Sequence, residues 1–130
     1  MKCELLTLCD AAADYNGKLS ILGSFDTIFA AQTPTVVNAC SIASRLRFEK
    51  GEEGEHSLKL AVIHRDGDPV MPPIEAKMVV RVPQGIASAA FNFSVNLQTV
   101  QFKDFGEYEI QLFVGGRKVS TIPFLILKQG

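Results

Sequence analysis

The stretch Phe91-Asn92-Phe93-Ser94-Val95-Asn96-Leu97-Gln98 decides the fold class, because apolar and polar residues alternate along it without interruption. A period of two places the apolar side chains on one face of an extended chain and the polar ones on the other. This pattern is typical of an antiparallel strand with one face in a hydrophobic core and the other in water. We therefore expect a half-buried strand here, with Phe91, Phe93, Val95 and Leu97 in the core.

Similar alternation recurs on both sides of this stretch, between clusters of glycine, proline and aspartate. Leu58 and Leu60 share one predicted core face, as do Ile110 and Leu112. No window of a dozen residues shows the period of an amphipathic helix. The sequence predicts about eight strands, near residues 2–9, 18–29, 37–49, 56–65, 70–82, 89–101, 107–114 and 117–127. We expect an all-β, two-layer antiparallel sandwich of immunoglobulin-like or Greek-key type.

Glycine-rich and acidic segments indicate where the predicted strands are connected. Asn16-Gly17 and Gly115-Gly116 are pairs that readily adopt the positive φ angles of tight hairpin turns. The acidic run Glu49–Glu55 and the run Arg65–Pro69 are each interpreted as a solvated hairpin loop.

Four features predict local departures from regular strands. Gly23 predicts a bend, and Ala11–Ala13 is compatible with one helical turn. Pro123 has no N–H to donate, so we place the last strand at a sheet edge. Tyr108 opens a strand after a turn, as in the tyrosine corner of Greek-key sandwiches, whose hydroxyl bonds to an upstream backbone group. A tyrosine packed there without that bond is the alternative.

Size and charge restrict the classes of partner. The chain has 130 residues, so we expect a single domain over residues 1–130. Thirteen basic and fourteen acidic residues give a net charge of -1, so we expect neither nucleic acid nor a membrane as partner. Six basic residues could still form a stripe on an outer sheet face, although ordinary solvated strands explain them better. They are Arg45, Arg47, Lys59, Arg65, Lys77 and Arg81.

The N-terminal run Met1–Cys9 is superficially similar to a secretion signal with a lipid-attachment cysteine. Glu4 interrupts the apolar run, and Leu8 stands where lipoprotein processing needs a small residue. No later segment has the length of apolar chain that a membrane helix requires. We therefore expect a cytoplasmic protein.

The three cysteines Cys3, Cys9 and Cys40 have no C-x-x-C spacing of a zinc or redox site. Cys3 and Cys9 would lie about 20 Å apart on one strand, beyond the reach of a disulfide. A bridge between Cys9 and Cys40 across strands stays open. We expect three free thiols that pack as small hydrophobic groups.

Two blocks of sequence carry a resemblance to a known family. The first is Cys9–Ala12 followed by Asn16–Ile28, and the second is Phe105–Tyr108 with the hairpin at Gly115-Gly116. With these blocks the chain resembles an uncharacterised bacterial family of small single-domain β-sandwich proteins. The first block is the more distinctive, since many immunoglobulin-like sandwiches share the second. The resemblance covers most of the chain and implies a fold; it implies no activity and no functional residues.

No catalytic, metal-binding or cofactor-binding set is recognisable in the sequence. His56 and His64 would lie about 26 Å apart on one continuous strand, too far apart to share a metal ion. Neither histidine is accompanied by a nucleophile motif. Asp66-Gly67-Asp68 lacks the further spaced oxygen ligands of a calcium loop. We therefore predict no catalytic residue, no metal site and no cofactor, and a protein that is not an enzyme.

A non-enzymatic protein-interaction or structural module is the leading functional hypothesis. It would bind another chain, or a copy of itself, through a sheet edge or the candidate loop formed by Asp10, Asp14, Tyr15 and Asn16. The aspartates of this region, with Asp26, could instead cap turns, which is the simplest interpretation, or bind a cation. A small-ligand or carbohydrate-binding module is the alternative, although the absence of tryptophan weakens a sugar platform.

Overall fold

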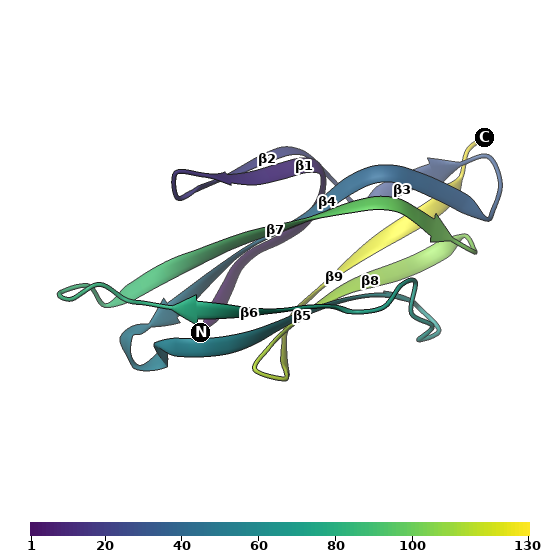
Figure 1. The fold of residues 1–130 in the computed structure, drawn as a ribbon. Helices are drawn as coiled ribbons and strands as arrows, with labels where there is room; N and C mark the ends of the chain where they lie inside the picture. Colours follow the sequence, from purple (N-terminus) through teal and green to yellow (C-terminus); the bar gives the residue numbers. More distant parts are fainter.

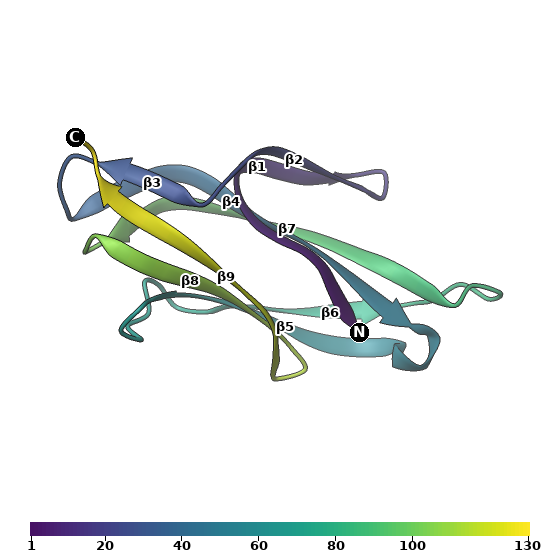
Figure 2. The same ribbon diagram turned by 180° about the vertical axis from the view of Figure 1, so that it is seen from behind.

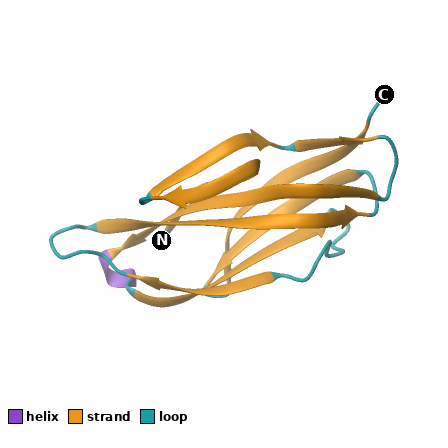
Figure 3. Cartoon of the chain, turned by 45° about the horizontal axis from the view of Figure 1, so that its top comes forward, coloured by secondary structure: helices purple, strands orange, loops and turns teal.

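The computed structural model describes residues 1–130 and consists almost entirely of β-strands (Figure 1). One turn of 3₁₀ helix, Lys50–Glu52, is the single helical segment (Figure 3). No helix is long and apolar enough to cross a membrane. The strands are β1 (Lys2–Tyr15), β2 (Lys18–Phe25), β3 (Thr27–Ala30), β4 (Thr35–Glu49), β5 (Gly54–His64), β6 (Ile74–Val80), β7 (Ser88–Phe102), β8 (Gly106–Val114) and β9 (Arg117–Lys128).

The strands form two sheets that pack face to face, which confirms the predicted sandwich (Figure 1). Sheet A has the order β2-β1-β4-β7, and sheet B has the order β3-β9-β8-β5-β6. The segment predicted as one strand over 18–29 is two strands, because the chain bends at Asp26 and passes from sheet A to sheet B. The Leu125 N–H donates to the Asp26 carbonyl at 2.8 Å, and β3 then pairs parallel with β9. The prediction of wholly antiparallel sheets is therefore wrong for this pair.

Apolar side chains from both sheets form one continuous core. Leu58, Leu60, Leu97, Ile110 and Leu112 are buried, as predicted. Full burial of such a side chain contributes about 1.5 to 3 kcal/mol. The other predicted core residues, Phe91, Phe93 and Val95, face the core but are only partly buried. The reason is that β7 ends sheet A, so no further strand covers its side chains.

Tyr108 forms the predicted tyrosine corner. Its hydroxyl donates to the Asp104 carbonyl at 2.7 Å, and its ring is almost fully buried. The ring stacks on Phe124 at 5.2 Å and meets Phe102 edge-on at 5.3 Å. Such aromatic contacts add about 0.5 to 1.5 kcal/mol each beyond their buried area. The corner therefore joins the loop before β8 to the core at one end of the sandwich.

Two predicted hairpin turns are confirmed. Asn16 and Gly17 have φ of 55° and 78°, and Gly115 and Gly116 have φ of 60° and 80°. Two positive φ values in succession give a turn whose twist matches that of the flanking strands. The helical turn that the sequence allows at Ala11–Ala13 does not form, because these residues extend β1 and pair with β2. Pairing with β2 outweighs the helical propensity of alanine.

The connection through Glu49–Glu55 is not the predicted hairpin loop. β4 lies in sheet A and β5 in sheet B, so this acidic run carries the chain from one layer to the other. Sequence periodicity defines each strand but not the sheet that it joins. The run Arg65–Pro69 does begin a connection between neighbouring antiparallel strands, β5 and β6, as predicted.

Pro123 lies on an interior strand, so the placement of the last strand at a sheet edge is wrong. β9 pairs with β8 on one side and with β3 on the other. However, β3 pairs only with Leu125–Lys128, and its ladder does not reach Pro123. Proline is tolerated there because no strand on that side needs its missing N–H.

The first hairpin leaves the plane of sheet A (Figure 2). β1 pairs with β4 only from Lys2 to Cys9, and its remaining residues pair with β2 alone. At the departure point Gly23 has φ of 67°, which confirms the predicted bend. A Cβ on Gly23 would come within 2.5 Å of Asp10 Oδ2, and the positive φ itself favours glycine there. We call residues 10–24 the β1–β2 hairpin.

Candidate functional site

β7 presents a long open edge, which we call the β7 edge. The strand has fifteen residues and pairs with β4 on one side only. It contains no charged residue and no proline. Unpaired N–H and C=O groups of such an edge can pair with another extended chain. The partly buried Phe91, Phe93 and Val95 lie along this edge on its core face.

The other outer strands of the two sheets are better protected against such pairing. β3 has four residues. β6 has seven residues, carries Glu75 and Lys77, and begins after Pro72-Pro73. Shortness, charge and proline are the usual devices that prevent edge-to-edge association. β2 belongs to the β1–β2 hairpin, in which Gly23 interrupts the regular strand. The β7 edge is therefore the longest stretch of sheet edge without charge, proline or glycine.

An irregularity at Thr99 ends the regular part of the β7 edge. Thr99 has φ of 55°, which is unusual for a β-branched residue. The pair Asn38–Thr99 is missing from the ladder between β4 and β7. Leu97 and Val100 are both buried although they are three residues apart. The core-facing residues of β7 therefore change from odd to even positions at Thr99. No signal in the alternation up to Gln98 announces this irregularity.

The four residues of the candidate loop lie on the β1–β2 hairpin rather than in a loop. Asp10, Asp14 and Tyr15 belong to β1, and only Asn16 lies in the turn. Asp14 Oδ1 accepts the Gly17 N–H at 3.0 Å, so this aspartate caps the turn. Tyr15 is 71% exposed.

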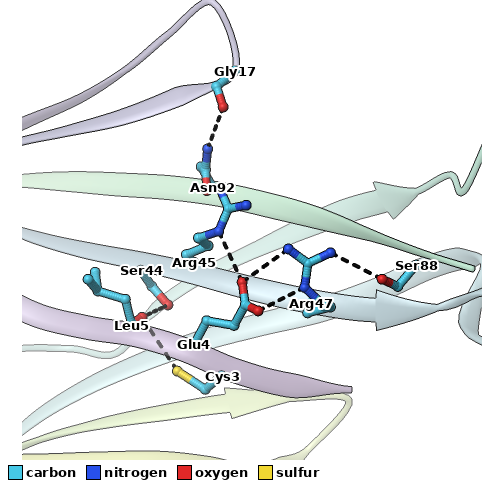
Figure 4. A network of polar contacts seen from close by, with 9 residues as sticks. All are labelled: Cys3, Glu4, Leu5, Gly17, Ser44, Arg45, Arg47, Ser88 and Asn92. Atoms are coloured by element: carbon cyan, nitrogen blue, oxygen red, sulfur yellow. Dashed lines mark hydrogen bonds and ion pairs between the residues drawn. The ribbon is translucent and has the colours of Figure 1, made fainter.

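The hairpin folds back over the outer face of sheet A (Figures 1 and 4). Asn92 of β7 donates through Nδ2 to the Gly17 carbonyl at the hairpin tip, at 3.2 Å. Cys9, Ser41 and Ala43 occupy outward positions of sheet A but are buried. The hairpin thus acts as a cover for part of this face. The alternation pattern alone would leave these three residues in solvent.

A network of polar side chains connects β1, β4 and β7 with the hairpin tip (Figure 4). Glu4 accepts from Arg45 Nε at 3.0 Å and from Arg47 Nε at 2.8 Å. Arg45 also donates to Asn92 Oδ1, and Arg47 donates to the Ser88 hydroxyl. The hydrogen bonds and positive charge of Arg47 and then Arg45 lower the pKa of Glu4 below its usual value. The network therefore fixes the Asn92 side chain that holds the hairpin tip.

The possible basic stripe is not assembled. Arg45 and Arg47 lie on sheet A, whereas Lys59 and Lys77 lie on sheet B, in the other layer. Both arginines share Glu4, and Lys77 lies 3.5 Å from Glu55. Lys59 Nζ lies 4.4 Å from the centre of the Phe113 ring. These basic groups have local partners on two separate faces.

The two histidines lie at opposite ends of β5, so they share no site. His56 Nε2 lies 2.6 Å from the Glu52 carbonyl, and its ring packs on Phe48. His64 Nδ1 lies 2.9 Å from Asp66 Oδ1, and its ring meets Tyr108 edge-on at 4.8 Å.

A polar cleft of about 350 Å³ opens beside His64, where the loop after β5 meets the end of β7; its lining includes Asp66, Asp68, Lys103 and Asp104. The Asp68 N–H and then His64 lower the pKa of Asp66. His64 Nε2 is buried without a hydrogen-bond partner. We call this opening the end cleft.

All three cysteines are free thiols in the structure, and Cys9 and Cys40 are buried. Burial raises the pKa of both thiols above the usual value. Since the thiolate is the nucleophilic form, these two groups are poor nucleophiles. Cys9 Sγ lies 3.5 Å from the Ser41 carbonyl, so the thiol takes part in the packing between β1 and β4.

Solved structures with similar folds contain much longer chains. An alkylpurine DNA glycosylase from Pseudomonas fluorescens, bound to DNA containing an abasic site analog, matches over 97% of this chain with a TM-score of 0.55 and 9% identity. The match covers 30% of the glycosylase chain. A β-glucosidase from Listeria innocua, in complex with isofagomine, matches over 96% of this chain with a TM-score of 0.53 and 7% identity. The match covers 16% of the glucosidase chain. These similarities show the fold alone.

Comparison with family models gives a more direct relationship. No curated protein matches the sequence. Residues 4–127 match the model of a family of unknown function, DUF6941. This range includes nearly all of both sheets and the whole of the β7 edge, the β1–β2 hairpin and the end cleft. The chain belongs to the DUF6941 family of unknown function.

Proposed function

We propose that this chain is a non-enzymatic protein-binding module and that the β7 edge binds an extended segment of a partner chain. The observation that carries this proposal is the length of the open edge together with its lack of charge and proline. A strand added beside β7 would satisfy its free backbone groups. It would also cover the exposed parts of Phe91 and Phe93. Backbone pairing and apolar burial would therefore act together.

The chemistry of the other candidate groups supports a binding role over a catalytic one. Both buried thiols have raised pKa values because of burial. The Tyr108 hydroxyl is engaged in its bond to the Asp104 carbonyl, and burial raises its pKa as well. Glu4 is engaged with two arginines. These groups have structural partners, and the three free thiols are consistent with our further proposal of a cytoplasmic location.

The solved neighbours contain the matching fold within longer chains. In the glycosylase and the glucosidase the matching fold is a minor part of a longer chain. Such a sandwich is joined there to other protein segments. We take no activity from either enzyme for this chain.

A small-ligand module is the second candidate function, and the end cleft is the observation that favours it. Its volume of about 350 Å³ is within the range of small-molecule pockets. His64 lines the cleft, and the Nε2 atom of this side chain is buried without a hydrogen-bond partner. The heteronuclear NMR spectrum with a panel of polar metabolites tests this candidate. Saturable shifts confined to residues around His64 would favour the ligand module over the protein-binding module.

Site-specific photo-crosslinking tests the protein-binding proposal. A photoreactive amino acid is placed at Gln98 on β7, and a matched control carries it at Val79 on β6; both positions are exposed and make no side-chain hydrogen bond. We expect illumination in cells of the source organism to give one protein adduct of defined mass from position 98. The control should give none. Adducts of equal yield from both positions, or none from position 98, would contradict the proposal.

A further inference from the structure

We infer that the partner of the β7 edge is a second copy of this chain, whose β7 pairs antiparallel with the first about a two-fold axis at Ser94. This inference rests on the proposed function, since it names the strand that the open edge binds. It follows from the register, charge and apolar pattern of β7.

The register of self-pairing is set by the limits of the regular edge. β7 begins at Ser88, and Thr99 interrupts it. The midpoint between these limits falls between Phe93 and Ser94, and we place the axis at Ser94, which has the smaller side chain of the two. A two-fold axis at Ser94 keeps the core faces of both copies on the same side, because odd residues then oppose odd residues. A register displaced by one residue would set core-facing side chains against outward ones.

Self-pairing in this register places compatible side chains opposite one another. Phe93 faces Val95 of the second copy, and Asn92 faces its Asn96. Aromatic and β-branched residues are favourable cross-strand partners, and the two amides bring no charge opposite each other. Phe91 faces Leu97 in the same way. The parts of Phe91, Phe93 and Val95 that one copy leaves exposed thus become covered by the other.

Charge distinguishes β7 from the corresponding strand of sheet B. β7 carries no charge, so two copies meet without repulsion between like charges. Self-pairing of β6 about its central residue, Lys77, would oppose two ammonium groups. Like charges directly opposite each other destabilise a strand pair. A symmetric dimer is therefore expected through β7 and not through β6.

Sedimentation velocity of the purified protein tests this inference. The unmodified chain is compared with variants that carry a positive or a negative charge at position 94. We expect the unmodified chain to be a dimer. Ser94→Lys and Ser94→Asp should each weaken dimerisation at least tenfold, because each opposes like charges across the axis. An equimolar mixture of the two variants should restore the dimer. Val79→Lys and Val79→Asp on β6 are matched controls that should stay dimeric.

A second variant keeps the test decisive if a charged variant does not fold. Ser94→Cys is nearly isosteric, and a short bismaleimide should join two copies through residue 94. Val79→Cys should give no joined dimer, and peptide mass mapping excludes products of Cys3. An unmodified chain that stays monomeric at all concentrations, or a dimer that both charged variants leave intact, would overturn the inference.

The outcomes separate this inference from the proposed function. A monomeric chain whose Gln98 photoprobe still captures one different protein overturns self-pairing and leaves the protein-binding proposal standing. A monomeric chain with no adduct at position 98 overturns both. A dimer that is restored by mixing the Ser94→Lys and Ser94→Asp variants supports both self-pairing and the protein-binding proposal.

Discussion

β6 and β7 are both outer strands, but they differ in how they are protected. β6 has seven residues, bears Glu75 and Lys77, and has a buried inward residue in Met78. β7 has fifteen residues, no charge, and partly exposed inward phenylalanines. Protection of an edge by charge and proline is a general device against association. Its presence on one strand and its absence from the other are the reason why we propose β7, and not β6, as the binding edge.

Truncation of inward side chains gives the largest expected difference between the two strands. Met78→Ala should reduce the free energy of unfolding by about 2 to 4 kcal/mol, because Met78 is fully packed in the core. For the monomer, Phe93→Ala should reduce it by less than the roughly 3 to 5 kcal/mol of a buried phenylalanine. Urea denaturation at low protein concentration measures both. A loss of the full core value at Phe93 under monomeric conditions would mean that β7 is not an open edge.

Relief of backbone strain at the end of the regular β7 edge should have the next largest effect. Thr99→Gly should stabilise the fold by about 1 kcal/mol, because a φ of 55° is unfavourable for a side chain with a Cβ. Asn16→Gly is the matched control, since Asn16 has the same φ but asparagine tolerates it. Thermal denaturation of both variants provides the comparison. Equal changes at the two positions would show that Thr99 is not strained.

Release of the hairpin from β7 should have a smaller effect. Asn92→Ala removes the bond to the Gly17 carbonyl and should destabilise the fold by about 1 kcal/mol. It should also accelerate amide hydrogen exchange within the β1–β2 hairpin while leaving β6 unchanged. Gln98→Ala, on the same strand, is the control. Unchanged exchange at Ala11–Ala13 in the Asn92 variant would show that the bond does not hold the hairpin.

The pH dependence contributed by Glu4 should be the smallest effect, because the group is exposed. Its pKa is lowered in the folded state, mainly by the hydrogen bond from Arg47. Its stabilising contribution is therefore present above the pKa of the unfolded chain and is lost as pH falls through the lower folded value. Glu4→Gln should remove this loss, so that the stability of the variant falls less on acidification. Denaturation curves of the unmodified chain and the Glu4 variant between neutral and acidic pH, repeated at high salt, measure this difference. Equal losses of stability in both proteins would contradict the prediction.

Local chemistry made the strands, turns and tyrosine corner predictable from the sequence. The alternation around Phe93 depends only on the two-residue period of an extended chain. Asn16-Gly17 and Gly115-Gly116 turn because these residues accept positive φ. The bond from Tyr108 to Asp104 joins groups four residues apart. The candidate interaction residues Asp10, Asp14, Tyr15 and Asn16 lie on one hairpin and not in a loop, and their role in binding stays a prediction.

The tertiary structure alone decided which strands became neighbours. Glu49–Glu55 crosses between sheets, β3 pairs parallel with β9, and Pro123 lies beyond the end of β3. Each of these depends on partners far away in the chain, about which a local pattern carries no information. The faces of β7 are a different case, because the two-residue period is local. The sequence alone therefore determined that one face of this strand is apolar and the other polar. Only the order of strands in sheet A decided that β7 lies at its end, where the missing neighbour leaves its backbone and its phenylalanines open to a partner.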